Sequence, residues 1–195
     1  MRDTAAIILA AGFSRRMGVQ KLLLPINGVP LLQRTLDVIS GFPFKNVILV
    51  STLIVANCVK THAQIVINPA PELGQSSSMR LGIQGANPGD SLFFFTGDQP
   101  LLDAETLSAI LAADDEDSIV FPKTTQGIAK NPTLFAPRFR DELCAVTGDM
   151  GGREVRNRHP GACRPVTVAD ERVLLDVDTV EDYEKVLRIL DGKEG

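Results

Sequence analysis

The 195-residue sequence contains no tryptophan, one tyrosine, two histidines and only three cysteines. Three cysteines far apart in sequence do not form a disulfide framework, so we expect a reducing compartment, the cytoplasm. Neither His62 nor His159 belongs to a complete set of cysteines and carboxylates at the spacing of zinc ligands, which argues against a zinc site. Each of these scarce residues is more simply interpreted as structural than as catalytic.

Long apolar runs and an excess of positive charge are also missing. No apolar run approaches the roughly 20 residues that cross a bilayer, and no signal-peptide pattern precedes the first strand-like segment, so no membrane partner is expected. The net charge of −4 argues against a nucleic-acid-binding surface. The length, with 44% hydrophobic and 23% charged residues, predicts one well-buried domain over residues 1–195.

Strand-like and helix-like segments alternate along the chain. Short apolar runs predict strands over residues 5–9, 46–50, 64–67, 91–96, 117–122, 132–135, 165–168 and 173–177. Apolar residues at helical spacing predict helices over residues 30–39, 76–85, 103–113, 138–146, 150–158 and 180–190, with N-caps at Ser76, Asp103 and Thr179. This alternation favours an α/β fold whose mostly parallel sheet is covered by helices on both faces. The denser strands near the end leave room for an antiparallel element that carries a second substrate.

The strongest chemical signal is I-I-L-A-A-G-F-S-R-R-M-G-V-Q-K, residues 7–21. After the predicted strand, small side chains leave the backbone N–H groups accessible to a ligand; these are Ala10, Ala11 and Gly12. Fixed positive charge follows at Arg15, Arg16 and Lys21. Loops at the carboxyl ends of parallel strands bind ligands, so this one predicts a nucleoside triphosphate site. The alternative is a tight turn with solvated arginines, and neither common glycine-rich phosphate motif is complete here.

Residues 9–25, L-A-A-G-F-S-R-R-M-G-V-Q-K-L-L-L-P, resemble the signature loop of the MobA-like nucleotidyltransferases. Within that family the sequence is most similar to the molybdenum cofactor cytidylyltransferases. The resemblance implies a Rossmann-like three-layer fold of the nucleotidyltransferase type and transfer of a nucleoside monophosphate from an NTP. It also implies Mg²⁺ as cofactor, CTP as donor, the terminal phosphate of molybdopterin (the molybdenum cofactor) as acceptor and a molybdoenzyme as recipient. A-A-G in place of the A-G-G of the guanylyl branch favours CTP.

Asp98 closes the Phe-rich strand in the sequence T-G-D-Q-P, residues 96–100. A carboxylate at the carboxyl end of this strand lies on the same edge as the first loop and is suited to hold Mg²⁺ beside a triphosphate. The alternative is an Asx turn before Pro100. G-D-Q-P is also the family's pattern at its metal-binding aspartate, and this resemblance favours a metal ligand.

Asp176 and Asp178 follow the last predicted strand, and alternation sends both side chains to the same side. The segment D-V-D-T-V-E-D-Y, residues 176–183, resembles the family's D-x-D-T-P-E-D-Y, which favours Asp178 as the second metal ligand. Asp176 stays open as an alternative. A competing interpretation makes Asp178 or Thr179 only a helix cap.

The segment G-Q-S-S-S-M-R, residues 74–80, lacks the last glycine of a nucleophile elbow, and no His–acid pair supports a serine hydrolase. It resembles the family's G-x-x-x-S-[LM]-R-x-G, which places Ser78 and Gly82 in the nucleotide site. Residues 130–135 and 147–153 resemble the family's G-[HN]-P-x-x-F and G-D-x-G-[AG]-R. Lys130 departs from the first of these patterns, where a glycine is usual.

These inferences assign catalysis to Arg16, Lys21 and Asp98 and the metal to Asp98 and Asp178. Nucleotide binding is assigned to Leu9, Ala10, Ala11, Gly12, Arg15, Lys21, Ser78, Gly82 and Asp98. The nearest alternative is the same chemistry with GTP or with a sugar or alcohol phosphate. A second alternative is a chaperone that only binds the cofactor. Pure binding does not require two metal carboxylates beside a lysine, so their presence argues against a chaperone.

Overall fold

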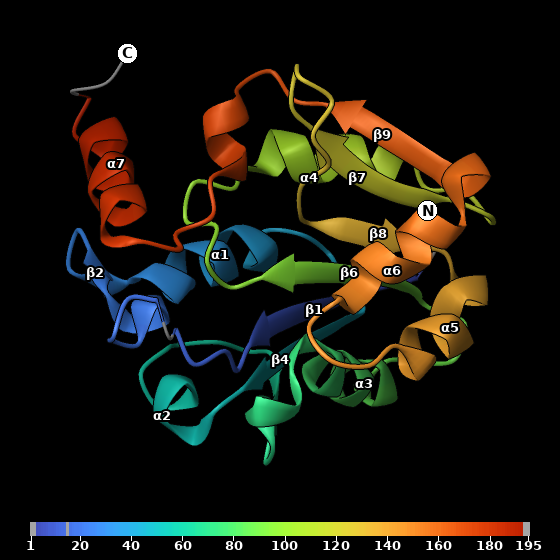
Figure 1. Cartoon of the computed structure of the whole chain (residues 1–195), viewed down its shortest axis with the longest axis horizontal. Coiled ribbons are helices and arrows are strands. Elements are labelled where there is room, and N and C mark those ends of the chain that lie inside the picture. The colour runs from blue at the N-terminus through green and yellow to red at the C-terminus, as the bar shows by residue number, and fades with distance from the viewer. Residues whose placement is uncertain (1–2, 15, 193–195) are drawn as a thin grey trace.

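The computed structural model describes residues 3–14 and 16–192. Its main sheet consists of β1 (Thr4–Ala10), β4 (Asn46–Ser51), β5 (Gln64–Ile67), β6 (Ser91–Thr96), β7 (Ile119–Lys123), β8 (Thr133–Phe135) and β9 (Cys163–Thr167). The seven strands lie in the order β5-β4-β1-β6-β8-β7-β9 (Figure 1). Only β8 runs antiparallel to its neighbours, β6 and β7. The mostly parallel sheet and the antiparallel element in the last third are therefore confirmed.

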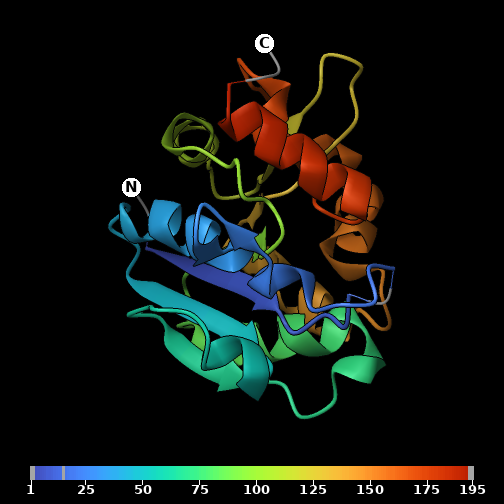
Figure 2. The ribbon, with the colours of Figure 1, turned by 90° about the vertical axis from the view of Figure 1, so that its left-hand side faces the viewer.

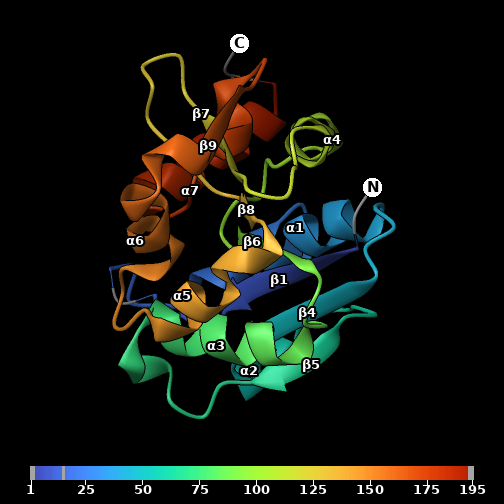
Figure 3. The ribbon, with the colours of Figure 1, turned by 90° about the vertical axis from the view of Figure 1, so that its right-hand side faces the viewer.

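Helices cover both faces of this sheet. They are α1 (Leu31–Ser40), α2 (Leu53–Ala56), α3 (Gln75–Gly85), α4 (Ala104–Ala112), α5 (Arg140–Ala145), α6 (Gly151–Arg158) and α7 (Val180–Leu190). Figure 3 shows α3, α5 and α6 on one face and α1 and α4 on the other. Figure 2 shows α7 beyond the sheet on the side of α1. The Tyr183 hydroxyl of α7 donates to Pro25 O at 2.5 Å. The expected three-layer arrangement is confirmed.

The alternation of side chains along β1 produces two cores. Ala6 and Ile8 pack with residues of α1 and α4, whereas Ala5 and Ile7 pack with residues of α3, α5 and α6. All four side chains are fully buried, as the central strand of a two-sided parallel sheet requires. This rigid strand ends at the loop that the sequence marks for phosphate binding.

Two short elements were not expected from the sequence. A hairpin of β2 (Pro25–Ile26) and β3 (Val29–Pro30) precedes α1, and the single-turn α2 follows β4. Both are too short to give a periodic apolar pattern. Among the described residues, no helix is long and apolar enough to cross a membrane.

The prediction of a strand over residues 173–177 is wrong. Glu171–Leu174 forms a 3-10 helix, started by the Asp170 carboxylate, which accepts from Arg172 N at 2.9 Å. Val173 and Leu174 are buried in a small separate cluster with Val168, so burial there does not require sheet pairing. A backbone hydrogen bond from Val177 N to Asp98 O, at 3.0 Å, ties the following segment to the turn after β6.

Of the three expected N-caps, Asp103 and Thr179 are confirmed. Thr106 N donates to the Asp103 carboxylate at 2.8 Å, and Asp182 N donates to Thr179 Oγ1 at 3.2 Å. Ser76 is not a cap, because α3 begins one residue earlier with Gly74 in the N-cap position. A carboxylate distant in sequence caps the helix instead, because Gln75 N donates to Asp149 Oδ1 at 3.2 Å.

Candidate active site

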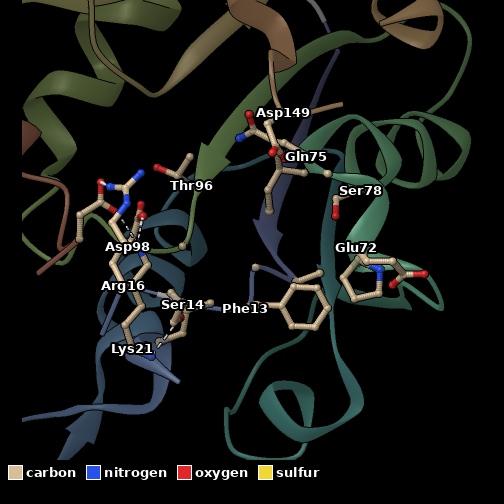
Figure 4. A pocket seen from close by; sticks show the side chains of 18 residues that line it. Phe13, Ser14, Arg16, Lys21, Glu72, Gln75, Ser78, Thr96, Asp98 and Asp149 are labelled. Atoms are coloured by element: carbon tan, nitrogen blue, oxygen red, sulfur yellow. Dashed lines mark hydrogen bonds and ion pairs between the residues drawn. The ribbon is translucent and has the colours of Figure 1, made fainter. Parts of the chain in front are cut away.

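A cavity of about 410 Å³ opens at the carboxyl ends of β1 and β6. Its walls come from the loop after β1, the start of α3, the residues after β6 and the segment before α7. Figure 4 shows Arg16, Lys21 and Asp98 on one side of this cavity and Gln75 and Ser78 on the opposite side. Segments far apart in the sequence thus meet at one edge of the sheet, where open α/β sheets bind their ligands.

The end of β1 lines the cavity through Leu9, and the loop after it does so through Ala11 and Gly12. Among the described residues, no atom beyond Gly12 and its two chain neighbours lies within 4 Å of the place where a Cβ on Gly12 would stand, so a ligand can approach the backbone there. Ala10 does not line the cavity, because it is buried in the core on the α1 side. Arg15 lies outside the described residues.

Gln20 holds this loop in place. Its side-chain amide donates to Gly12 O at 3.3 Å, and its carbonyl accepts from Ser14 Oγ at 3.0 Å. Ser14 itself has a positive φ of 51° and accepts from Lys21 N at 3.2 Å. The sequence pattern gave no reason to select Gln20, because its contacts depend on how the loop folds back on itself.

Lys21 joins the two carboxylates that the sequence selected. Its Nζ lies 2.7 Å from Asp98 Oδ2 and 2.8 Å from Asp178 Oδ1. Arg16 adds a second cation, with Nη1 2.9 Å from Asp178 Oδ2. The structure therefore places all four residues at one side of the cavity.

The charges in this cluster stabilise one another. Burial opposes the Lys21 ammonium, but Asp98 and Asp178 outweigh it and raise the pKa of Lys21 above its usual value. The hydrogen bond from Lys21 is the main reason that the pKa of Asp178 is lowered, and the charge of Arg16 adds to it. At neutral pH, Lys21 is protonated and Asp178 is ionised.

The carboxylates of this cluster fit a divalent cation shared with a nucleotide. Asp98 Oδ1 is buried without a hydrogen-bond partner among the described residues, and its other oxygen faces Lys21 beside Asp178. The described part of the chain has no group of three or more His, Cys, Asp or Glu side chains placed to hold a metal. Mg²⁺ typically takes one or two carboxylates and completes its shell with phosphate oxygens and water. The donor set suits such a shared site rather than an all-protein cage.

The Asp178 side chain does not cap α7. The cap of α7 is a reciprocal pair in which Asp182 N donates to Thr179 Oγ1 and Thr179 N donates to Asp182 Oδ2 at 2.9 Å. The Asp178 carboxylate instead accepts from Lys21 and Arg16. Asp176 points to a different partner, Lys130, at 2.9 Å.

On the opposite wall, Ser78 lines the cavity and Gly82 does not. Asn68 Nδ2 donates to the hydroxyls of both Ser77 and Ser78 at 2.9 Å, which fixes the orientation of these side chains. A Cβ on Gly82 would stand 2.3 Å from Ile7 Cγ2, so this glycine lets α3 pack closely on β1. The expectation that Gly82 contacts the nucleotide is therefore not supported by its position.

A second cavity of about 310 Å³ adjoins the first. The two share Leu9, Gln75, Thr96 and Asp149 in their walls. The second cavity is also lined by residues of β8 and α6 and by Lys130. The sequence motifs that begin at Lys130 and Thr147 thus lie beside the motif that begins at Gly74.

Comparison with known proteins identifies the family of this chain. The model of the MobA-like NTP transferase domain matches residues 6–163. The chain belongs to the MobA-like NTP transferase family. This match covers the loop after β1, Asp98 and the motifs that begin at Gly74 and Thr147, and it ends before Asp178.

Two curated relatives of this MobA-like protein extend over nearly its whole length. The purine catabolism protein PucB of Bacillus subtilis is 27% identical, over 94% of this chain and 96% of its own. A molybdenum cofactor guanylyltransferase of Xanthomonas euvesicatoria is also 27% identical, over 95% of each chain. Together with the family match, the guanylyltransferase relative supports a nucleotidyltransferase.

Solved structures give the same fold. A homologue of Mycobacterium tuberculosis Rv0371c from Mycobacterium sp. strain JC1 superposes with a TM-score of 0.84, at 28% identity and with 100% of both chains covered. The manganese complex of Rv0371c from M. tuberculosis H37Rv superposes with a TM-score of 0.81, at 25% identity, over 96% of this chain and 98% of that one. The Rossmann-like α/β architecture expected from the sequence is therefore confirmed.

Proposed function

We propose that this MobA-like protein is a Mg²⁺-dependent cytidylyltransferase that moves CMP from CTP to the terminal phosphate of the molybdenum cofactor, releasing pyrophosphate. The observation that carries this proposal is the bridge formed by Lys21 between Asp98 and Asp178 at the mouth of the first cavity. Two carboxylates and a lysine beside open backbone amides suit the triphosphate of a nucleotide better than passive cofactor storage. The product would pass to a molybdoenzyme in the cytoplasm.

The first cavity would hold CTP in one orientation. Its phosphates lie against the loop after β1, where Arg16 and Lys21 supply charge and Gly12 leaves the backbone accessible. The cytosine and ribose lie toward Ser78. Because the Ser78 oxygen accepts from Asn68, its hydroxyl proton is available to an acceptor such as the cytosine carbonyl.

The reaction is an in-line displacement at the α-phosphorus of CTP. An oxygen of the acceptor phosphate forms the new P–O bond, the bond to the bridging oxygen breaks, and its electron pair leaves with pyrophosphate. The attacking phosphate is already anionic near neutral pH, so the chain needs no general base. Lys21 and Arg16 would stabilise the charge that develops on pyrophosphate. Mg²⁺ held by Asp98 and Asp178 would neutralise the phosphate oxygens and orient them.

The decisive experiment incubates the protein with each labelled NTP, Mg²⁺ and molybdenum cofactor. We expect pyrophosphate release and a cytosine dinucleotide of the cofactor only when CTP is present. Formation of the guanine dinucleotide with GTP would replace the proposal by its nearest alternative, which the similarity to the Xanthomonas guanylyltransferase also favours. Tight cofactor binding without pyrophosphate release from any NTP would favour a chaperone.

A further inference from the structure

The second cavity carries positive charge on the side formed by α6. Arg153 and Arg156 are three positions apart on this helix, so they share one of its faces, and both line the cavity. The cavity also has an apolar surface that includes Phe94, Phe135 and Met79. A ligand with an anionic group and an apolar body would match these two surfaces.

The charges of Arg153 and Arg156 are not neutralised within the described part of the chain. No carboxylate there forms an ion pair with either guanidinium. Arg158 on the same helix differs, because it pairs with Glu154 and also lies 3.6 Å from Glu142. On this helix, the arginine outside the cavity wall is therefore paired with carboxylates. The two arginines that line the cavity have no carboxylate partner among the described residues.

Arg156 is held in a fixed position. Its Cζ lies 4.6 Å from the centre of the Phe121 ring in β7, so the guanidinium rests on an aromatic face. Burial lowers the pKa of Arg156, and the neighbouring charge of Arg153 lowers it further. A partly buried, oriented cation with a like charge beside it is stabilised by an anion from outside the chain.

Lys130 adds charge from a different element. It stands between β7 and β8, lines the same cavity and pairs with Asp176 at 2.9 Å. The side chains of this pair are 32% and 29% exposed, so the ammonium can still reach a ligand. The other carboxylate of this wall besides Asp176 is that of Asp149, which already accepts from Gln75 N. The cavity is thus left with a net positive lining.

We infer that Arg156, with Arg153 and Lys130 around the same cavity, binds the phosphate of the acceptor substrate and determines specificity for an anionic acceptor. The identification of the bound group as the phosphate of the acceptor rests on the proposed function. The presence of a site for an anion rests on the structure alone. Arg156 lies outside every segment that carries the family resemblance, and Lys130 departs from the family pattern. The shared wall at Leu9 and Thr96 would bring a phosphate bound here toward the α-phosphate of the nucleotide.

The first test separates acceptor binding from nucleotide binding by steady-state kinetics. We expect Arg156→Gln to raise the KM for molybdenum cofactor by about 10-fold or more, as the loss of one charge-assisted hydrogen bond predicts, with the KM for CTP unchanged. Arg156→Lys should recover part of the loss, and Arg153→Gln should act in the same direction. Arg158→Gln is the matched control and should leave both KM values unchanged. Equal acceptor KM values in Arg156→Gln, Arg153→Gln and the parent would overturn the inference while leaving the proposed reaction intact.

A second measurement does not depend on turnover. Protein with ¹⁵N-labelled arginine is titrated with inorganic phosphate while a non-hydrolysable CTP analogue fills the first cavity. The Nε–H signals of Arg153 and Arg156 should shift and the signal of Arg158 should not. Such shifts in a protein that shows no nucleotidyl transfer would support the anion site and reject the proposed function. Unmoved Arg153 and Arg156 signals would reject the site itself.

Discussion

At the scale of single residues, Lys21 decides how the charges of the first cavity are arranged. It contacts Asp98 and Asp178 at the same time, and its side chain is only 14% exposed. The ion pairs that surround it are therefore screened less than surface pairs, and their geometry is fixed before a substrate arrives. This residue can stabilise both the resting site and the departing pyrophosphate.

Replacing Lys21 by alanine should lower kcat far more than it lowers stability. One fixed cation at the transition state contributes about 3 kcal/mol, which corresponds to roughly a hundredfold in rate. The measurement is turnover at saturating CTP and acceptor, with the melting temperature recorded in parallel. Lys45→Ala serves as control, because Lys45 pairs with Asp3 on the surface, away from the cavity. Parent-like turnover of Lys21→Ala would exclude Lys21 from catalysis.

The two carboxylates should act as one unit. Asp98→Asn and Asp178→Asn should each fold and each lose most activity, and the double variant should lose little more, because residues of one site are strongly non-additive. Mg²⁺ titration of the CTP complex and kcat measure the effect. Asp37→Asn, on the outer surface of α1, is the control. If Asp178→Asn binds Mg²⁺ and turns over like the parent, Asp176 becomes the candidate ligand.

At the scale of elements, the contact between α3 and β1 sets the distance across the cavity. Gly82 allows this contact, because any Cβ there would meet the Ile7 side chain at 2.3 Å. The start of the same helix is held by Asp149 and by Gly148, whose carbonyl accepts from Ser76 N at 3.0 Å. The packing of α3 therefore sets the position of Ser78, which belongs to this helix, on the wall of the first cavity.

Gly82→Ala should destabilise the protein, and any rise in the KM for CTP should accompany this loss of stability, because Gly82 itself does not line the cavity. Overpacking of this kind costs about 1–3 kcal/mol, and each kcal/mol lowers the melting temperature of a domain of this size by about 2–4 °C. Gly89→Ala is the matched control, since no described atom outside its chain neighbours lies within 4 Å of its added Cβ. Thermal unfolding and the KM for CTP are the two measurements. A large rise in KM without a loss of melting temperature would return Gly82 to the nucleotide site.

At the scale of the whole molecule, the sheet edge brings two adjoining cavities into contact. The first combines open backbone with Lys21, Asp98 and Asp178, and the second combines an apolar surface with cationic side chains. Four residues belong to both walls, so ligands in the two cavities would meet there. This arrangement suits a transfer between two substrates better than a reaction with water.

CTP should stabilise the folded protein more than GTP or ATP does. A ligand at 100 times its Kd adds about 2.7 kcal/mol to the stability of the folded state, so the melting temperature reports selectivity directly. We expect the largest rise with CTP and Mg²⁺ together, a smaller one after chelation with EDTA, and a kcat/KM ratio of CTP over GTP of about 10-fold or more. Equal values for CTP and GTP would contradict the preference that Ala11 and Ser78 suggest.

Local sequence determined much of the fold. The apolar runs at β1, β4 and β6 are long and uninterrupted enough to indicate buried strands, and Asp103 and Thr179 mark helix starts through contacts within four residues. The loop after β1 carries its own signature because small residues and cations follow one another directly. These features depend on neighbours in the chain, so they can be identified without the tertiary structure.

Tertiary structure alone decided the contacts between distant segments. The run at Val173 is apolar enough for a strand, but its side chains bury against Val168 and the backbone turns into a 3-10 helix. Lys21 reaches Asp178 across 157 positions, and Asn68 orients Ser78 although no motif marks it. The grouping of Arg156 with Lys130 in one cavity has the same origin. Such contacts depend on how layers pack, and packing is a property of the whole chain rather than of any segment.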